Sequence, residues 1–288
     1  MTAAALTLVL ISGLVHASWN FLLKKSGGGT GLVTLASLLS LVVYLPVAGT
    51  VAWLQDYRFQ WPHLALMFAS GMVHTVYFLL LERAYRSGGD LSIVYPLARA
   101  TGPLLTIVVA VLLLGERPGP VALGGAVLIG ASALLLTGNP FAWHKTSARN
   151  AVGFALLTGF CISVYTIWDK WSVATWLIPP LVYDWGCNAS RVAVLIPWTR
   201  HRAPGGLRRA WAEQRKTAIT IAILSPLSYI LVLTAMVFTP VSLVAPAREV
   251  SILFAAFMGA HFLREGDLTR RLVAAAGMAL GIAGLALG

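Results

Sequence analysis

Two apolar stretches of this chain resemble each other closely enough to limit the folds that it can adopt. Residues Ser92–Glu116 have the sequence SIVYPLARATGPLLTIVVAVLLLGE, and residues Ser242–Glu265 have the sequence SLVAPAREVSILFAAFMGAHFLRE. Both begin Ser-aliphatic-Val-x-Pro, both place an arginine soon after the proline, and both end in a glutamate. The spacing from Arg99 to Glu116 is 17 positions, and so is the spacing from Arg248 to Glu265.

A second pair of similar stretches lies upstream of the first. Residues Gly13–Lys24 (GLVHASWNFLLK) and Gly159–Lys170 (GFCISVYTIWDK) share a spacing of eleven positions from glycine to lysine. The two pairs occur in the same order, offset by roughly half of the chain. This arrangement indicates one unit that has been duplicated and fused.

The composition excludes a water-soluble globule. Hydrophobic residues make up 58% of the chain, charged residues make up 11%, and the mean hydropathy is +0.80. A soluble domain needs more polar surface than this, so we predict a multi-pass integral membrane protein. The net charge of +11 does not indicate a nucleic-acid partner, because the basic residues lie in short loops, where they set topology and contact anionic lipids.

The apolar segments predict ten membrane spans. A helix crosses the hydrocarbon core of a bilayer with about 20 apolar residues, so we predict an all-α protein with two five-helix units, residues 1–138 and 139–288. Because five is an odd number, the second unit inserts upside down relative to the first, as in transporters built from inverted repeats. The predicted spans are Thr2–Leu23, Gly31–Leu54, Pro62–Tyr85, Leu91–Leu114, Pro120–Thr137, Ala151–Trp168, Trp176–Trp198, Thr217–Phe238, Val241–Leu263 and Arg271–Leu287.

Basic residues are distributed unevenly among the loops. Fifteen of the 21 Lys and Arg residues follow the odd-numbered spans, whereas only Arg58, Arg117 and Lys170 lie in the other loops. The positive-inside rule therefore places the odd loops in the cytoplasm and both termini outside. We expect the protein in the inner membrane of a bacterial-type cell.

These features resemble a known family. They include Trp19 and Lys24 late in the first span, and Pro96 and Pro246 in the fourth and ninth spans, each followed by a closing glutamate. In these respects the chain resembles the drug/metabolite transporter superfamily, and within it the proteins built from two EamA-type repeats. The resemblance covers essentially the whole chain. It implies a central cavity lined by spans 1, 3, 4, 6, 8 and 9, with spans 5 and 10 outside it. It also implies cytoplasmic termini, the opposite of the charge count.

Several ionisable residues lie deep inside the predicted spans, where each needs a partner or a watery cavity. At ~1.5 Å of rise per residue, His16 and Arg99 lie about 12 Å from one membrane face, and Arg248 and Glu249 lie about 10 Å from the opposite face. His74 lies near the middle of the third span. These residues therefore occupy one central slab, as a substrate site at the midplane requires.

Two interpretations of Arg99 and Arg248 stay open. Each follows a proline that frees a backbone carbonyl, that of Ser92 or Ser242, and so creates a polar spot in each unit. A planar guanidinium that stays charged suits an anionic substrate group such as a carboxylate, phosphate or phosphonate. Alternatively, each arginine is neutralised within the protein. Arg248 and Glu249 are neighbours, but adjacent helix positions diverge, which makes that pairing unfavourable.

His16, Trp19 and Asn20 share one face of the first span through their i, i+3, i+4 spacing. A histidine at this depth can exchange protons near neutral pH and so couple transport to a proton gradient. A neutral histidine bonded to a neighbouring helix is the alternative interpretation. The two halves of this site are asymmetric, because the corresponding positions in the second unit are Ile162, Tyr165 and Thr166.

Aromatic residues are candidate cavity walls because they combine apolar faces with hydrogen-bonding tips. His74 is a candidate binding residue or a bridge between helices. The predicted substrate-binding residues are His16, Trp19, Asn20, His74, Tyr77, Tyr95, Arg99, Tyr165, Trp168, Tyr229, Arg248 and Glu249.

Two further groups are interpreted as structural. Asp184, Asn188 and Arg191 form a polar strip on the seventh span through their i, i+4, i+7 spacing. Glu116 and Glu265 close spans 4 and 9, where each would cap a turn or pair with a neighbouring arginine.

Small residues at four-residue spacing allow close helix packing in the fifth and tenth spans. They are Ala126 and Gly130, and Gly277 and Gly281. The packing partner is either the same chain or a second copy, so both a monomer and a homodimer remain open.

Together these observations predict a secondary transporter that works by alternating access. We expect a small polar substrate with an anionic group, amino-acid-like or phosphonate/phosphate-like, with protons as a candidate coupling ion and lipids as neighbours. The alternatives are an exporter of cationic or aromatic compounds, and a non-transporting receptor or an intramembrane lipid-modifying enzyme. An enzyme is disfavoured because no HExxH or GxSxG motif occurs and because His16 and His74 lack an acidic partner at matching depth. We predict no cofactor and no bound metal.

Overall fold

The computed structural model describes backbone residues 1–86, 91–135, 146–263 and 268–288. Within these ranges it describes the side chains except at positions 78, 81–86, 91–97, 146–151, 256, 259–263, 268 and 271. All regular structure in this part of the chain is helical, which confirms the all-α prediction.

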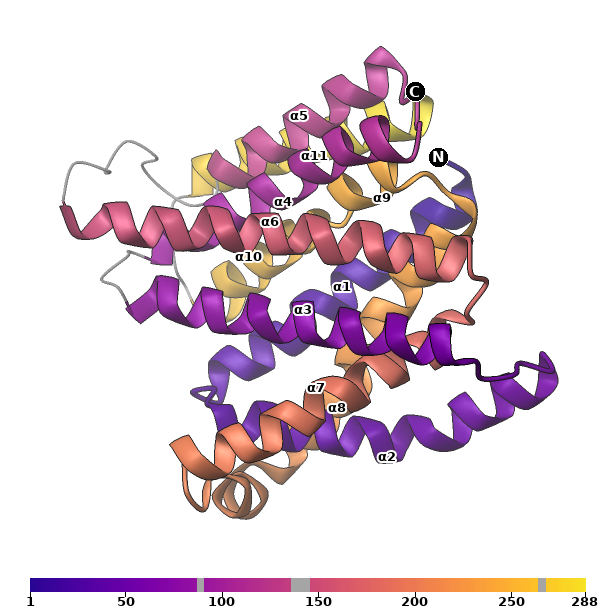
Figure 1. Cartoon of the computed structure of the whole chain (residues 1–288). Helices are drawn as coiled ribbons and strands as arrows, with labels where there is room; N and C mark the ends of the chain where they lie inside the picture. The colour runs from indigo at the N-terminus through magenta and orange to yellow at the C-terminus, as the bar shows by residue number, and fades with distance from the viewer. Residues whose placement is uncertain (87–90, 136–145, 264–267) are drawn as a thin grey trace.

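The helices of the first half follow the predicted spans closely (Figure 1). They are α1 (Ala3–Lys25), α2 (Thr30–Leu54), α3 (Trp61–Arg86), α4 (Leu91–Leu113) and α5 (Pro120–Leu135). The second half contains α6 (Thr146–Ala174), α7 (Pro180–Arg202), α8 (Gly206–Phe238), α9 (Val241–Ala247), α10 (Val250–Leu263) and α11 (Leu268–Leu287). Helices α9 and α10 together occupy the ninth predicted span.

Helix α6 is longer than the sequence predicts. The predicted span ends at Trp168, but the helix continues to Ala174, so Asp169 and Lys170 lie inside it and not in a loop. The assignment of Lys170 to a loop is therefore wrong. The helix continues because apolar positions such as Val173 remain buried beyond the lysine. The chain turns only at residues 175–179, before the helix-starting Pro180.

The ninth predicted span is broken at Arg248 and Glu249. Past Pro246 the backbone hydrogen bonds change from the α-helical pattern to the tighter i→i−3 pattern. The Glu249 amide donates to the Pro246 carbonyl (3.0 Å), and the Ser251 amide donates to the Arg248 carbonyl (3.1 Å). By contrast, α4 runs as one helix over Leu91–Leu113. The two units therefore differ at the position where the sequence predicts similar loosening, and the break places Arg248 at a helix junction.

Helix α8 begins earlier than its predicted span. The sequence predicts a basic loop at Thr199–Lys216, but α7 continues to Arg202 and α8 begins at Gly206. Non-helical angles at Gln214 (φ −131°, ψ 21°) divide α8 into a short basic segment and an apolar span. The Gln214 amide donates to the Ser26 carbonyl (3.1 Å), so the basic segment lies against the connection between α1 and α2.

The helices pack in corresponding pairs across the two halves. The contact of α1 with α8 corresponds to the contact of α6 with α3. In the same way, the contact of α4 with α6 corresponds to the contact of α10 with α1. Helices α2 and α7 contact each other, and so do α5 and α11, which Figure 1 shows side by side. The largest cluster of buried apolar side chains, including Val9, Tyr183 and Met236, lies within this arrangement.

Helices α5 and α11 approach so closely that glycine is required between them. A Cβ atom on Gly125 would lie 2.5 Å from the Gly281 carbonyl oxygen, and one on Gly281 would lie 2.7 Å from the Gly125 carbonyl oxygen. The small residues of these helices therefore pack within one chain. Gly125, which precedes the predicted Ala126, meets the backbone of α11, and a Cβ atom on the predicted Gly277 would lie 2.2 Å from the Ser132 hydroxyl oxygen on α5.

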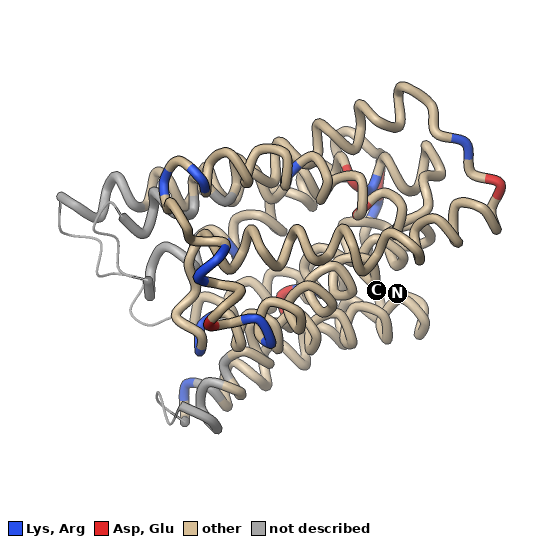
Figure 2. Tube along the Cα trace, turned by 90° about the horizontal axis from the view of Figure 1, so that it is seen from below, with Lys and Arg blue, Asp and Glu red and all other residues tan. Residues whose placement is uncertain are grey.

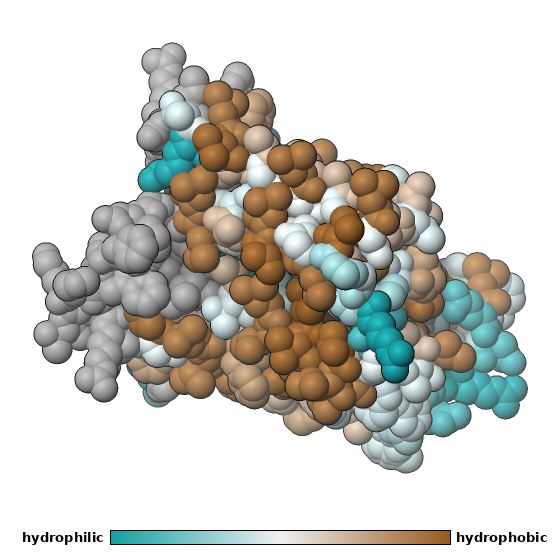
Figure 3. Space-filling model, turned by 90° about the horizontal axis from the view of Figure 1, so that it is seen from above, coloured by the Kyte–Doolittle hydropathy of each residue, from teal (hydrophilic) through white to brown (hydrophobic). Residues whose placement is uncertain are grey.

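The outer surface fits a lipid environment. Among the described helices, four are long and apolar enough to cross a membrane, namely Ala3–Lys25, Thr30–Leu54, Val152–Ala174 and Gly206–Phe238, and three more are apolar but shorter. Large apolar side chains are exposed on the outside, as on Leu112 (73%), and Figure 3 shows them covering much of one face. Figure 2 shows the described basic residues gathered mainly at one end, away from the termini. The protein is an integral membrane protein.

Candidate substrate-binding site

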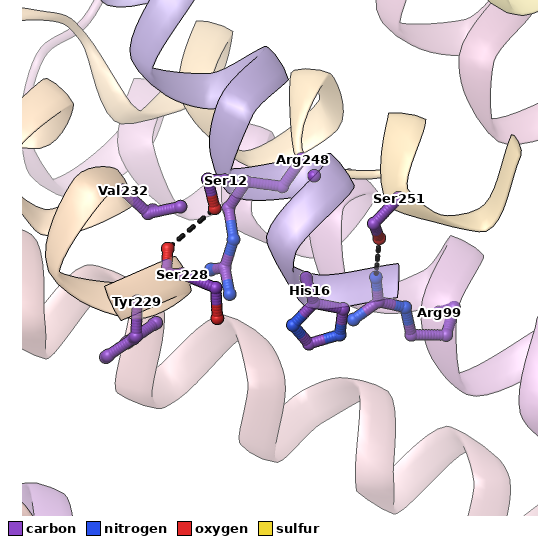
Figure 4. A pocket seen from close by; sticks show the side chains of 9 residues that line it. Ser12, His16, Arg99, Ser228, Tyr229, Val232, Arg248 and Ser251 are labelled. Carbon is purple, nitrogen blue, oxygen red and sulfur yellow. Dashed lines mark hydrogen bonds between the residues drawn. The ribbon is translucent and has the colours of Figure 1, made fainter. Parts of the chain in front are cut away.

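Two small pockets lie on either side of Arg99 and Arg248 inside the bundle. The first pocket (Figure 4) lies between α1, α4, α8 and the start of α10, and is lined by Ser12, Gly13, His16, Arg99, Ser228, Tyr229, Val232, Arg248 and Ser251. The second is lined by Arg99, Pro103, Thr106, Ile162, Tyr165, Thr166, Ala245, Arg248 and Glu249. Each has a volume of about 10 Å³, which is room for about one water molecule. This arrangement is therefore closed to a metabolite.

Gly13 allows α1 to approach α10 at the first pocket. A Cβ atom on Gly13 would lie 2.6 Å from Cγ1 of Val250, so any larger residue would displace the two helices. One residue earlier, the Ser12 hydroxyl donates to the Ser228 carbonyl (2.6 Å) and ties α1 to α8. These contacts bring the polar faces of three helices together around the pocket.

Arg99 is neutralised within the protein. Its Nε lies 3.1 Å from Oε2 of Glu249, and both side chains are nearly inaccessible, with 9% and 6% exposed. Its Nη2 also donates to the Ser251 hydroxyl (3.0 Å). Of the two interpretations of this arginine, the geometry supports internal neutralisation. The partner is the glutamate next to Arg248, and the pair joins α4 to the junction of α9 and α10 across the two halves.

Arg248 lies at the junction of α9 and α10 and has no ion-pair partner within the described part of the chain. Its guanidinium carbon lies 5.3 Å from the centre of the Tyr229 ring, a distance at which a cation and an aromatic face attract each other. Figure 4 shows its side chain reaching toward Ser228 and Tyr229. This half-buried arginine contributes to both pockets.

Of the predicted face on α1, only His16 lines a pocket. Its ring meets the Trp19 ring edge-on at 5.0 Å, and Trp19 itself packs against a separate apolar cluster between α2 and α8. The Asn20 amide donates to the His16 carbonyl within the same helix (2.8 Å). His16 lies beside Arg99 in Figure 4.

The predicted aromatic residues divide into two groups. Tyr165 and Tyr229 line the pockets, and His74 stacks on Tyr165 (centroids 4.0 Å apart) and meets Tyr229 edge-on (5.6 Å). Tyr77 meets Tyr165 edge-on at 6.0 Å. His74 and Tyr77 thus support the pocket wall from α3.

Trp168 and Tyr95 do not contribute to the described pockets. The Trp168 ring donates from Nε1 to the Leu66 carbonyl (3.0 Å) and packs against Trp171, so it joins α6 to α3. The side chain of Tyr95 lies outside the described residues.

Asp169 is the polar residue that sequence reasoning missed. It is fully buried, and its carboxylate accepts hydrogen bonds from the hydroxyls of Ser70 (2.6 Å), Tyr183 (2.7 Å) and Tyr229. The hydroxyls belong to α3, α7 and α8, so the carboxylate on α6 joins four helices. The predicted sixth span ends at Trp168, so Asp169 fell just outside it. The apolar residues beyond this position were the signal that α6 continues.

This network also corrects the prediction that His74 lacks an acidic partner at its depth. The Ser70 hydroxyl lies 3.3 Å from Nδ1 of His74 and donates to Asp169. One serine therefore links the histidine to a carboxylate.

Glu116 and Lys170 hold the connection between α8 and α9. The two carboxylate oxygens of Glu116 accept from the backbone amides of Val241 (2.8 Å) and Ser242 (2.9 Å), which caps α9. The Lys170 ammonium donates to the Thr239 carbonyl (3.1 Å) and to that of Met236. The predicted capping by Glu116 therefore occurs, but across the two halves. Glu265 lies outside the described residues.

The polar strip on α7 joins this helix to α2. Arg191 donates to the Asn188 side-chain oxygen (2.7 Å), and the Asn188 amide donates to the Ser37 carbonyl (3.0 Å). Neither residue lines the pockets.

Comparison with known proteins identifies the family. Residues 3–138 match the EamA-like transporter family. The first half of the chain is an EamA-type unit. This places the chain in the drug/metabolite transporter superfamily, as the resemblance predicts, and makes it a membrane protein of a transporter family. No curated protein matches the chain. One protein of known crystal structure is similar over 100% of this chain and 98% of its own, with a TM-score of 0.78 at 14% identity, a likeness that establishes the fold alone.

Proposed function

We propose that this EamA-type protein is a secondary transporter for a small polar metabolite that carries an anionic group. The observation that supports this most directly is Arg248. It is a charged residue at a helix junction in the centre of the bundle, it contributes to both pockets, and it has no ion-pair partner among the described residues. A charged residue inside a membrane protein has a high free-energy cost, so it is usually retained only where a function requires it.

The charges around the pockets favour an anion. Among the residues that line the pockets, Arg99 and Arg248 supply two positive charges and Glu249 supplies one negative charge, so the lining keeps one net positive charge toward a ligand. A guanidinium forms paired hydrogen bonds with a carboxylate or phosphate. His16 and the hydroxyls of Ser12 and Ser251 line the first pocket and add polar groups that can orient a second part of the substrate.

The closed pockets support alternating access as the transport cycle. A volume of about 10 Å³ holds no metabolite, so binding requires the helices to separate. The break between α9 and α10 provides a joint next to Arg248. Corresponding helix pairs in the two halves fit a pair of inverted repeats that rock around a central site.

The test is a thermal-shift screen of the purified protein in detergent. Its panel contains amino acids, phosphonates, phosphorylated metabolites and cationic amines, applied to the wild type and to Arg248→Ala and Arg248→Lys variants. A ligand that binds the folded state stabilises it by mass action, by about 2.7 kcal/mol at 100 times its Kd. The matched control is Arg58→Ala, which removes an arginine that is exposed at the end of the bundle.

We expect an anionic compound to stabilise the wild type and the Arg58→Ala variant, and to lose its effect in Arg248→Ala. Arg248→Lys should retain only part of the effect because a lysine cannot donate a paired hydrogen bond. The same compound should then exchange across the membrane of proteoliposomes. Stabilisation by cationic amines alone, unchanged in the Arg248 variants, would favour the exporter of cationic or aromatic compounds.

A further inference from the structure

Asp169 is a carboxylate that the packing of the helices does not by itself explain. It is 0% exposed in a membrane-spanning helix, and within the described part of the chain it forms no ion pair. The neighbouring lysine does not neutralise it, because Lys170 donates to the carbonyls of Met236 and Thr239. Burying an ionised carboxylate without a cation is costly.

The hydrogen bonds of Asp169 depend on its charge state. The hydroxyls of Ser70, Tyr183 and Tyr229 all donate to its two oxygens, an arrangement that suits a carboxylate that only accepts. A protonated carboxyl group is itself a donor. Once it carries a proton, the new O–H group needs an acceptor, so the hydrogen bonds around Asp169 must rearrange.

Tyr229 connects this carboxylate to the pocket. Its hydroxyl donates to Asp169, its ring lies under the guanidinium of Arg248, and it lines the first pocket. The negative charge of Asp169 therefore lies one side chain away from the positive charge of Arg248. An anion bound to Arg248 would compensate the positive charge of Arg248 in place of Asp169. The negative charge of this anion would also repel that of Asp169 and so favour the neutral, protonated form of Asp169.

We propose that Asp169 carries the coupling proton of this transporter. The proton forms an O–H bond with one carboxylate oxygen as an anion binds at Arg248, and it leaves when the anion leaves. One positive and one negative charge thus enter together, and no other reactant is needed. Because linkage is reciprocal, a protonated Asp169 also favours the bound anion. The coupling role rests on the proposed transport of an anion, whereas the protonation of Asp169 does not.

Other ionisable groups lie around Asp169 and are alternative proton carriers. His74 on α3 is the closest alternative because Ser70 links it to the carboxylate. The groups that face this region from the surrounding helices are His74 of α3, Arg99 of α4, Tyr165 of α6, Tyr183, Asp184, Cys187 and Arg191 of α7, Tyr229 of α8, and Arg248 and Glu249 at the junction of α9 and α10.

The experiment is an infrared difference titration of the full-length protein in proteoliposomes, with and without deuterium exchange. Protonation of a buried carboxylate produces a carbonyl band that deuterium shifts. The titration runs from about pH 9 to about pH 4, a range that covers buried carboxyl groups. The variants are Asp169→Asn, His74→Gln and, as matched control, Asp184→Asn, which removes another intramembrane aspartate.

We expect the band in the wild type, in His74→Gln and in Asp184→Asn, and its loss in Asp169→Asn. A titration that is the same in Asp169→Asn and in the wild type would overturn the proposal. If Asp169→Asn does not fold, Ser70→Ala and Tyr183→Phe give the answer. Each removes one hydrogen bond to this carboxyl group, so each should change the frequency of the band. An unchanged frequency in both would also overturn the proposal.

The substrate class is tested separately by the ligand screen. A band that depends on Asp169 without stabilisation by any anion would leave the proton site in place and refute the anionic substrate. Stabilisation by an anion through Arg248 without a band from Asp169 would support the anionic substrate and refute the proton site. The two proposals therefore fail independently.

Discussion

Glu249 is the residue on which the charge balance of the pockets depends. It compensates Arg99 at 3.1 Å, and only 4% of its surface is exposed. Because Glu249 pairs with the arginine of the other half, its own neighbour Arg248 has no ion-pair partner among the described residues. The charge of Arg248 therefore stays uncompensated beside the pockets. One carboxylate thus gives two arginines of similar sequence context different roles.

Glu249→Gln should strongly destabilise the protein, because it leaves Arg99 buried without a counter-charge, a change that costs about 3–5 kcal/mol. The double variant Arg99→Gln, Glu249→Gln should recover part of the loss. The measurement is thermal unfolding in detergent. Asp56→Asn is the control, since the Asp56–Arg58 pair is exposed and such pairs contribute little. Equal unfolding temperatures for Glu249→Gln and the wild type would refute the role given to this pair.

At the scale of elements, the close packing of α5 on α11 depends on glycine residues at their contact. Adjacent residues of α5 provide a matched comparison, because a Cβ atom on Gly125 would clash with the Gly281 carbonyl, whereas one on Gly124 would meet nothing within 4 Å. Gly125→Ala should therefore destabilise the protein by about 1–3 kcal/mol through overpacking. Gly124→Ala should stabilise it slightly, because alanine favours a helix by about 1 kcal/mol over glycine. Equal effects in thermal unfolding would contradict this packing.

The capped start of α9 gives a second prediction at this scale. Glu116→Ala removes the acceptor of the Val241 and Ser242 amides, so it should cost about 0.5–2 kcal/mol, as loss of a helix cap does. Glu213→Ala, which changes an exposed glutamate on α8, should have little effect. Hydrogen exchange at residues 239–245 measures the local loosening, which should appear only in the Glu116 variant. Equal exchange in both variants would argue against the cap.

At the scale of the whole molecule, the proposed inverted repeat predicts opposite membrane faces for corresponding loops. In a chain without Cys161 and Cys187, Lys25→Cys at the end of α1 should react with a membrane-impermeant maleimide only from the cytoplasm. Leu177→Cys after α6, a position that is 71% exposed, should react only from outside. Labelling of both from the same side would refute the inversion. Opposite sides in the reverse sense would keep the inversion and place the termini in the cytoplasm.

Local features of the sequence were enough to predict the helices and the family. The hydropathy of about 20-residue segments determines what crosses a bilayer, and the 17-residue spacing from arginine to glutamate in both halves indicated the duplication. The central placement of His16, Arg99 and Arg248 also followed from their depth in the spans. These properties depend on residues that are neighbours along the chain, so they can be predicted without knowledge of the tertiary structure.

The partners of the buried charges were decided by the tertiary structure. Arg99 pairs with Glu249, which lies 150 positions later, and Asp169 collects its donors from three other helices. The break at Arg248 and the length of α6 likewise depend on what packs against each helix. The sequence by itself determined a helical membrane protein with charges at its centre, and it predicted a duplicated unit. Which of those charges has an ion-pair partner among the described residues was decided only by the fold, because compensation depends on distances between helices.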